Sequence, residues 1–162
     1  MPGWKFPRPL PALAAVLALF CGLAISTAFA GPKWLITPDE AARAGFPTGG
    51  LKEPAAAVEG PGPLIVVKDP KALKRLRSPI YIFIAFEPGS SGLPPDMKTL
   101  NVTLIGFFDI DITDRVREYI KGSNLEIEKA DLPTGNHRLR MSIKDVDGNP
   151  NERDVVVRVV GE

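Results

Sequence analysis

The sequence predicts an all-β fold, arranged as a two-sheet antiparallel sandwich of about six or seven short strands with one short helix. Two observations carry this prediction. Beyond Pro61 the apolar residues recur with period two, in runs that Pro, Gly, Asn and Asp interrupt. The 162 residues also include 17 Pro and 15 Gly, and so many helix breakers argue against a helical bundle. A parallel α/β fold would need a helix after each strand, and the pattern does not alternate in that way.

The N-terminal segment has the three-part pattern of a secretory signal peptide. A basic start contains Lys5 and Arg8, an apolar stretch covers residues 12–25, and Ala28 and Ala30 occupy the small-residue positions of a cleavage site. We therefore expect a signal peptide over residues 1–30, cleavage near Ala30, and a periplasmic or secreted protein. An uncleaved anchor is the alternative, because the apolar stretch approaches the roughly 20 residues of a membrane span.

The overall composition excludes several classes of function. Lys and Arg number 20 against 19 Asp and Glu, so the chain lacks the basic excess typical of a nucleic-acid-binding protein. With one His and one Cys, clusters of thiolate and imidazole metal ligands are excluded as well. Because Cys21 lies in the predicted leader, the exported chain has no disulfide, and its fold must depend on an apolar core.

Residues 31–62 are rich in Pro, Gly and Ala and predict a flexible linker, because few large apolar side chains are present to offset the entropy of ordering the chain. One short helix is expected near residues 38–44. Its signals are an N-cap, a proline at the first helical position, a capping-box glutamate and a terminating glycine, at Thr37, Pro38, Glu40 and Gly45. We expect three flanking apolar residues, namely Trp34, Leu35 and Phe46, to dock this helix on the domain, with docking on a partner as the alternative.

The sandwich domain is expected over residues 63–162, where six segments have the length and alternation of strands. They are 64–68, 79–87, 100–105, 125–128, 137–144 and 154–160. The second segment is apolar on both faces, which predicts a central strand. Residues 112–120, between the third and fourth segments, have apolar side chains at helical spacing, with Thr113 as the cap. They predict one short helix that crosses between the sheets.

The last two predicted strands form a hairpin around a polar turn at 145–153. Folding them about this turn aligns their apolar residues on one face, which then points to the core. The expected inward pairs are Ile143 with Val155, Met141 with Val157 and Leu139 with Val159. On the outer face the same register pairs Lys144 with Asp154, which attract, and Arg140 with Arg158, which repel.

Three groups of residues are similar to those of a known family. The segment 130–149 contains a Leu-Pro-Thr-Gly-Asn-His turn, a strand that ends in Asp, and a Gly-Asn pair. Related signatures stand at 86–88 and 109–115. Residues 63–160 thereby resemble the immunoglobulin-like domains of secreted bacterial proteins, although they lack the intersheet cysteines and the core Trp of antibody domains. The resemblance implies an immunoglobulin-like sandwich that serves as a binding or structural module of the bacterial cell envelope.

The turn of the last hairpin is a candidate cation site. Oxygen-bearing side chains alternate at Asp145, Asp147 and Asn149, as in a calcium loop, and the sandwich order brings Asp96 to the same end. The spacing departs from an EF-hand, because the glycine is fourth and the twelfth residue is Val156. The alternative is a hairpin turn in which these side chains bond to their own backbone. We predict a weak Ca²⁺ site at most, and no other cofactor.

A basic stripe on the outer face of the same hairpin is a second candidate. It consists of Arg138, Arg140, Lys144 and Arg158. Such a stripe indicates either a surface for an anionic partner or a solvated face that nearby carboxylates neutralise. His137 begins the strand on its core-facing side, and we expect it to bond to a backbone carbonyl. The acidic cluster Asp109, Asp111 and Asp114 is expected at the opposite end from Asp145, with Asp111 and Asp114 capping the following helix.

These observations together favour an exported, non-catalytic module that binds an envelope protein or a surface polymer. A membrane is an expected partner only if the leader is retained. Two alternatives stay open. One is a Ca²⁺-dependent enzyme that uses the acidic loops, and the other is a membrane-tethered accessory subunit with an uncleaved N-terminal anchor.

Overall fold

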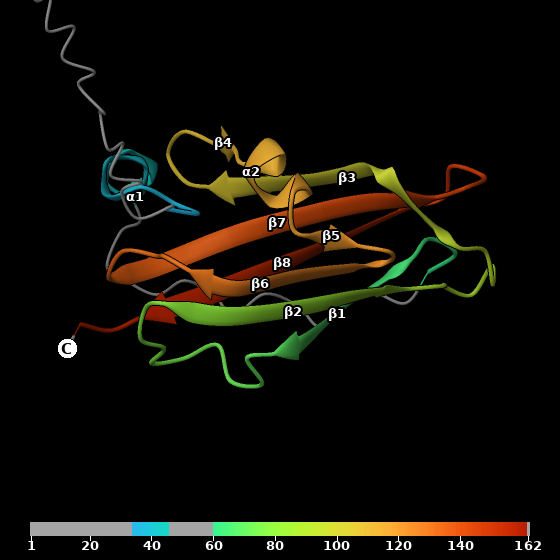
Figure 1. Ribbon diagram of the computed structural model, residues 1–162. Helices are drawn as coiled ribbons and strands as arrows, with labels where there is room; N and C mark the ends of the chain where they lie inside the picture. Colours follow the sequence, from blue (N-terminus) through green and yellow to red (C-terminus); the bar gives the residue numbers. More distant parts are fainter. Residues whose placement is uncertain (1–33, 46–59, 162) are drawn as a thin grey trace, which may run out of the picture. The chain divides into compact units, whose positions relative to one another are not determined.

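The computed structural model describes residues 34–45 and 60–161. Two four-stranded antiparallel sheets lie face to face in this part of the chain (Figure 1). The first sheet has, in spatial order, β1 (Leu64–Asp69), β2 (Ile80–Glu87), β6 (Asn124–Ala130) and β5 (Ile120–Lys121). The second has β4 (Ile110–Asp111), β3 (Pro95–Ile105), β7 (Gly135–Asp145) and β8 (Pro150–Val159). The helices are α1 (Pro38–Ala44) and α2 (Thr113–Arg117). The prediction of an all-β sandwich is confirmed.

Each of the six predicted strands corresponds to an observed strand, and β2 lies between β1 and β6 as expected of a central strand. The two-residue strands β4 and β5 were not predicted, because alternation cannot be recognised over so short a length. Strand β3 begins earlier than expected, at Pro95, because an irregularity between Asp96 and Asn101 interrupts its pairing with β7 without ending the strand.

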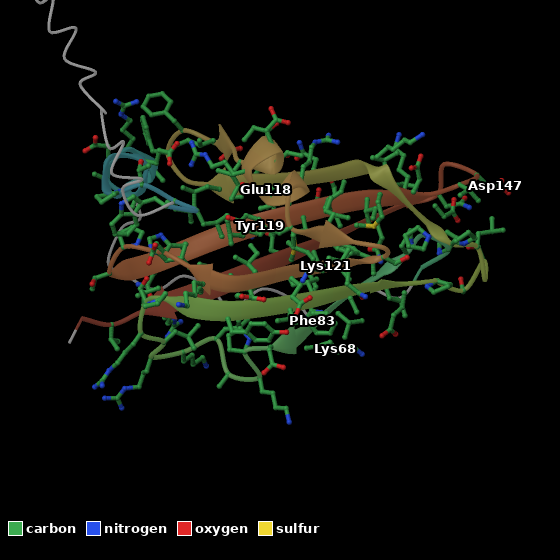
Figure 2. The ribbon with its side chains drawn as sticks, in the orientation of Figure 1. Lys68, Phe83, Glu118, Tyr119, Lys121 and Asp147 are labelled. Atoms are coloured by element: carbon green, nitrogen blue, oxygen red, sulfur yellow. The ribbon has the colours of Figure 1, made fainter. Side chains whose placement is uncertain are left out.

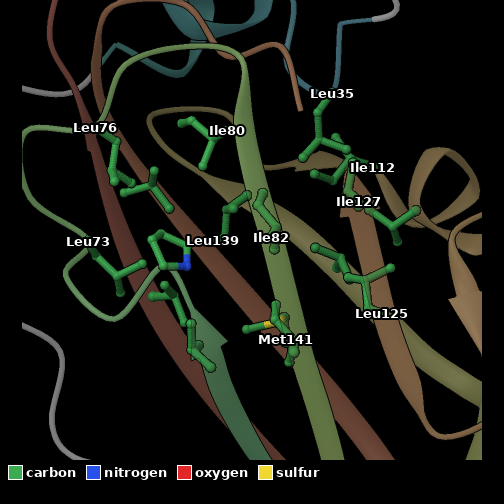
Figure 3. Close-up of a pocket in the computed structure, with 17 residues that line it drawn as sticks. Leu35, Leu73, Leu76, Ile80, Ile82, Ile112, Leu125, Ile127, Leu139 and Met141 are labelled. Atoms are coloured by element: carbon green, nitrogen blue, oxygen red, sulfur yellow. The ribbon is translucent and has the colours of Figure 1, made fainter. Parts of the chain in front are cut away.

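The core lies between the two sheets. Strand β2 points Ile80, Ile82, Ile84 and Phe86 inward, and the alternating apolar residues of β3, β7 and β8 face them. A cavity of about 40 Å³ remains between the layers, and its lining is entirely apolar (Figure 3). A space of this size without polar groups holds no ordered water. It is therefore a packing gap of the core and not a ligand site.

The register of the β7–β8 hairpin differs from the predicted one. Leu139 lies opposite Val155, four residues earlier in β8 than the predicted Val159. Because the displacement is an even number of residues, every side chain keeps its expected face, and the core pattern is preserved. The observed inward pairs are Leu139 with Val155, Met141 with Arg153 and Ile143 with Asn151.

The predicted outer pairs of this hairpin are wrong for the same reason. Lys144 lies opposite Pro150 and Arg140 opposite Asp154. The turn is shorter than the predicted 145–153, because Asp145 closes it at Asn149: the Asp145 amide donates to the Asn149 carbonyl at 3.0 Å. Several registers that differ by an even number of residues satisfy the alternation equally well, and the hydrogen bond that closes this turn selects one of them.

The segment of residues 34–45 packs on the sandwich as expected. The capping box is present: the Glu40 amide donates to Thr37 Oγ1 at 3.2 Å, and the Thr37 amide donates to Glu40 Oε2 at 2.9 Å. Gly45 ends α1 with a φ of 47°, a conformation that glycine adopts readily. Ile36 and Ala44 are fully buried in the core. Phe46 and the predicted leader lie outside the described residues.

Helix α2 connects β4 of one sheet to β5 of the other, which confirms the predicted crossing. Thr113 is not its cap, however. The Thr113 hydroxyl oxygen accepts a hydrogen bond from the Val102 amide at 2.9 Å and so fastens the helix to β3. Asp111 instead accepts the Thr113 amide at 2.8 Å, and Asp114 lies 3.4 Å from Arg117.

The loop between β1 and β2, residues 70–79, covers the outer edge of β8. The Leu76 amide donates to the Arg158 carbonyl at 2.9 Å, and the Arg158 amide donates to the Leu73 carbonyl at 2.8 Å. Nearer the other end of β8, Asn151 Nδ2 donates to the Pro63 carbonyl of the segment before β1 at 2.8 Å. The edge of β8 is thereby blocked against pairing with another chain, a common protection of sheet edges.

Candidate binding site at one end of the sandwich

The Asp145 carboxylate is buried within the turn that it closes. It accepts hydrogen bonds from the amides of Asp147 and Asn149 at 3.0 and 2.9 Å, from Asn149 Nδ2 at 2.8 Å, and from the Ser91 hydroxyl at 2.9 Å. Burial by itself would raise the pKa of Asp145, but these hydrogen bonds outweigh it and hold that pKa below its ordinary value. The carboxylate therefore builds the turn.

The other predicted calcium ligands lie at the same end of the sandwich. Asp147 is exposed at the tip of the β7–β8 turn (Figure 2). Asp96 pairs with Lys144 in the β3–β7 ladder, and its Oδ1 accepts the Lys98 amide at 3.1 Å. Among residues 34–45 and 60–161, no group of three or more His, Cys, Asp and Glu side chains is arranged to hold a metal ion. The geometry favours the hairpin-turn interpretation of this motif.

The predicted basic stripe is divided in the structure. Arg138 and Arg140 both bind Asp154, through Nε donors at 2.9 and 2.8 Å, and Arg140 lies 3.1 Å from Glu152. The hydrogen bonds from Arg140, opposed by burial and assisted by those from Arg138, hold the pKa of Asp154 below its ordinary value. These two arginines are therefore neutralised. Lys144 and Arg158 lie at opposite ends of the hairpin.

His137 has the structural position that the sequence indicates. Its Nε2 lies 2.7 Å from the Pro133 carbonyl oxygen, and because a carbonyl only accepts, Nε2 carries the proton. The side chain is 2% exposed, and Nδ1 is buried without a hydrogen-bond partner. Burial lowers the pKa of His137, against the opposing effect of the Pro133 bond, so the ring is neutral at pH 7.

The outer face of the first sheet carries compensated charges. Lys68 pairs with Glu87 at 2.8 Å, and Glu126 accepts from Lys121 at 2.9 Å and from the Tyr81 hydroxyl at 3.1 Å. Figure 2 shows Lys68 and Lys121 on this side of the molecule, with Phe83 of β2. This face therefore has the ion pairs of an ordinary solvated surface.

The loop between β3 and β4 exposes two aromatic rings. Phe107 is 80% exposed and Phe108 is 65% exposed, and their rings meet edge to face with centroids 4.9 Å apart. The backbone beneath them is fixed: the Phe107 amide donates to the Ala44 carbonyl at 2.7 Å, and the Gly106 amide donates to Asp109 Oδ1 at 3.2 Å. The rings are therefore presented to solvent by a well-anchored loop.

Only glycine fits beneath this aromatic pair. A Cβ at position 106 would lie 2.3 Å from the Ala44 carbonyl oxygen, which is closer than real Cβ contacts. The alternation of apolar residues does not predict this site, although the sequence holds a signal for it. Two large aromatics follow Gly106 and precede Asp109, outside the alternation of β3, so neither has a predicted place in the core.

A second missed feature is the basic loop, which we define as residues 70–79 between β1 and β2. Its four basic side chains are exposed, and no acidic residue interrupts them: Lys71, Lys74, Arg75 and Arg77. Leu73 and Leu76 line the core cavity and fasten the loop to the sandwich (Figure 3). The charged residues consequently point away from the core while the apolar ones fill it.

Backbone geometry at the tip of the basic loop is unusual. Arg75 has a φ of 61°, a value that residues other than glycine rarely adopt, and it is the one such case in the part of the chain that the structure describes. Beside it lies an open hollow of about 550 Å³, lined by Lys74, Arg75, Arg158, Thr134–Asn136 and Val159–Gly161. Arg158 therefore belongs with the basic loop and not with Arg138 and Arg140.

Both missed features lie at one end of the sandwich, which we call the Phe107 end. In the second sheet, the end of β3 and the end of β8 both lie beside the start of β7. In the first sheet, the start of β2 lies beside the end of β6. The β3–β4 loop therefore projects from this end, where α1 also lies (Figure 1), and the basic loop reaches the same end along the outer edge of β8. Trp34 joins them there by bridging to Asp131, just beyond β6.

No family model, curated protein or solved structure matches this chain. Neither helix in residues 34–45 and 60–161 has the length and hydrophobicity of a membrane span.

Proposed function

We propose that the chain is an exported, non-catalytic binding module of the bacterial cell envelope with an immunoglobulin-like fold. The strand order supports the fold type. In immunoglobulin domains one sheet has the order A-B-E-D and the other places C′ beside C, F and G. The orders β1-β2-β6-β5 and β4-β3-β7-β8 correspond to these when the strands are lettered along the chain. The three-part pattern of residues 1–30 supports export.

The exposed pair of Phe107 and Phe108 is the observation that carries the binding function. A large apolar side chain left in water forgoes about 1.5 to 3 kcal/mol of burial free energy, which a partner can recover. Loops that a rigid scaffold positions are also where binding residues concentrate in sandwich folds. The Phe107 end is therefore the proposed binding site, for an envelope protein or a surface polymer.

A photo-reactive phenylalanine analogue at position 108 tests this function in cells. The matched control places the same analogue at Val146, which is 58% exposed at the opposite end of the sandwich. We expect a cross-linked adduct from position 108 and none from position 146, and we expect Phe107→Ser to reduce that adduct about tenfold. Equal adducts from both positions, or none from either, would contradict the proposal.

Retention of the leader is a separate question with a direct measurement. The pattern at Ala28 and Ala30 supports cleavage, and the apolar stretch of residues 12–25 supports the alternative of a membrane-tethered subunit. Intact mass spectrometry of the protein recovered from cells distinguishes them, because cleavage after Ala30 removes 30 residues. A full-length mass in the membrane fraction would show that the leader is retained and that the protein is a membrane-tethered subunit and not a secreted one.

A further inference from the structure

A pocket of about 260 Å³ opens beside α2, and we call it the Trp34 pocket. Its lining comes from three parts of the chain, namely the segment of Trp34 and Leu35, the helix α2 with the residues that follow it, and strand β6. Leu35, Ile127 and Ala130 are buried and form its base. Trp34 and Tyr119 are half-buried, and Figure 2 shows Tyr119 close to α2.

The lining of the Trp34 pocket suits an apolar ring. Five of its eight residues are apolar or aromatic. Among the charged ones, Arg115 donates to Glu40 Oε2 at 2.7 Å and to the Leu35 carbonyl at 3.1 Å, so its charge is neutralised within the fold. A cavity of about 150 Å³ with apolar walls is large enough to bind benzene. The Trp34 pocket therefore has room for one phenyl ring.

Phe107 is an exposed ring that does not fill the pocket of its own chain. Its amide donates to the Ala44 carbonyl at 2.7 Å, which holds the backbone in place, and its side chain is 80% exposed. Helix α1 nevertheless connects the two features, because Ala44 contacts Phe107 while Glu40 bonds to Arg115 of the pocket. One molecule thus carries both an exposed ring and a pocket for a ring.

The area of the contact favours a second copy of the chain as the partner. A phenylalanine side chain buries about 200 Å², so Phe107 and Phe108, which are 80% and 65% exposed, together offer roughly 300 Å². The surface that covers them loses a similar area, which gives roughly 600 Å² in total, the size of a crystal-packing contact. Two copies related by a two-fold axis make the contact twice and bury roughly 1,200 Å², the lower limit of specific interfaces.

We infer that the chain forms a two-fold dimer in which Phe107 of each copy enters the Trp34 pocket of the other copy. This inference rests on the proposed binding function, because it names the partner of the same site. Each ring gains the burial that it lacks in the single chain. An interface of this small size predicts a dissociation constant of about micromolar.

Sedimentation equilibrium of the protein as recovered from cells measures the dimer. Phe107→Ser should weaken each of the two contacts about tenfold, and the dimer therefore about a hundredfold. Val146→Ser is the matched control, because it removes an exposed apolar side chain at the opposite end of the sandwich. It should change the dissociation constant less than twofold. Circular dichroism confirms that both variants are folded.

The pocket is tested by mixing two variants. Trp34→Ala removes one wall of the pocket and should weaken the dimer as Phe107→Ser does. A mixed dimer keeps one complete contact, because the Trp34→Ala copy supplies the ring and the Phe107→Ser copy supplies the pocket. The mixture should therefore associate about tenfold more tightly than either variant alone. Misfolding of either variant cannot produce this rescue.

Cross-linking between two copies locates the contact. An unlabelled chain with a photo-reactive phenylalanine analogue at position 107 is mixed with an isotope-labelled wild-type chain. We expect adducts that join position 107 to Trp34, Tyr119 or Lys129 of the labelled chain, all of which line the pocket. The same analogue at Val146 is the control and should give no such adduct.

The dimer would be overturned by a chain that stays monomeric well above micromolar concentration, by an unchanged dimer in Phe107→Ser, by a mixture without rescue, or by adducts away from the pocket. If the chain is monomeric while position 108 still cross-links another partner in cells, the dimer is excluded and the proposed binding function survives. If no adduct forms in cells either, the binding function itself is wrong.

Discussion

The two ends of the sandwich use polar and apolar residues in opposite ways. At the β7–β8 turn, Asp145 directs its carboxylate to the amides and side chains of its own loop, and little of its chemistry is left for a partner. At the Phe107 end, backbone hydrogen bonds, the Asp109 carboxylate and the packing of Leu73 and Leu76 fix the loops. The side chains of Phe107, Phe108 and Lys71 remain in solvent. The Asp145 turn, which resembles a calcium loop in the sequence, is therefore structural. The β3–β4 loop and the basic loop, which contain no recognisable motif, carry the candidate function.

The largest expected effect lies at the Asp145 turn. Asp145→Ala removes the one carboxylate that the amides of Asp147 and Asn149, the Asn149 side chain and the Ser91 hydroxyl share, so we expect the midpoint of thermal unfolding to fall by about 10 °C. Asp147→Ala is the matched control, because its exposed side chain should change the midpoint by about 1 °C at most. Similar midpoints for the two variants would show that the turn does not depend on Asp145.

Gly106→Ala should have the next largest effect, because it forces a Cβ into the Ala44 carbonyl beneath the aromatic pair. Overpacking against backbone predicts a fall in the midpoint of about 7 °C, together with loss of cross-linking from position 108. Gly60→Ala is the control, since a Cβ there meets nothing within 4 Å. A Gly106→Ala protein with an unchanged midpoint would mean that the loop is not anchored on α1.

The contact of Arg115 with Glu40 predicts a pH-dependent effect of intermediate size. Hydrogen bonds from Arg115, opposed by burial and assisted by Thr37, lower the pKa of Glu40 to about 2 from 4.5. Because the folded pKa is depressed, the contact stabilises the fold fully above pH 4.5, and this contribution is lost as the pH falls towards 2. Arg115→Ala should lower the midpoint by about 5 °C at pH 7.

The difference in the midpoint of thermal unfolding between the wild-type protein and Arg115→Ala should decrease steadily below pH 4.5. Arg117→Ala removes an exposed arginine 3.4 Å from Asp114 and should change the midpoint by about 1 °C or less at any pH. If the difference in midpoint between the wild-type protein and Arg115→Ala stays constant from pH 7 to pH 3, the ionised Glu40 carboxylate is not what Arg115 stabilises.

His137 gives the smallest effect, with a pH dependence in a different range. Its folded pKa lies below the ordinary 6.5, so the unfolded state binds more protons, and stability falls as the pH drops through 6.5. We expect the midpoint to fall by about 3 °C between pH 7 and pH 5.5. His137→Gln should remove this slope, and an unchanged slope would show that another group is responsible.

Local patterns account for most of what could be predicted. The capping box at Thr37 and Glu40, the stop at Gly45 and the inward alternation of β7 involve neighbours along the chain, so they could be recognised directly. The position of His137 followed from the same alternation. The two-residue strands could not be predicted, because their pairing depends on where α2 places them.

The candidate site was harder to predict because neutralisation and exposure depend on distant parts of the chain. Arg138 and Arg140 form a basic stripe in the sequence, but the observed register brings Asp154 between them. Phe107 and Phe108 form an apolar pair of the kind that usually enters a core, but the contact of Gly106 with Ala44 turns them outward. Neither outcome can be derived from neighbouring residues.

The sequence by itself determined the all-β class, the faces of the main strands and the limits of α1, because strand periodicity and helix capping act over a few residues. Only the tertiary structure decided the register of β7 against β8, the partners of Arg138 and Arg140, and the exposure of Phe107 and Phe108 in the β3–β4 loop. These features depend on contacts between residues far apart in the chain, and several arrangements satisfy the local pattern equally well until those contacts form.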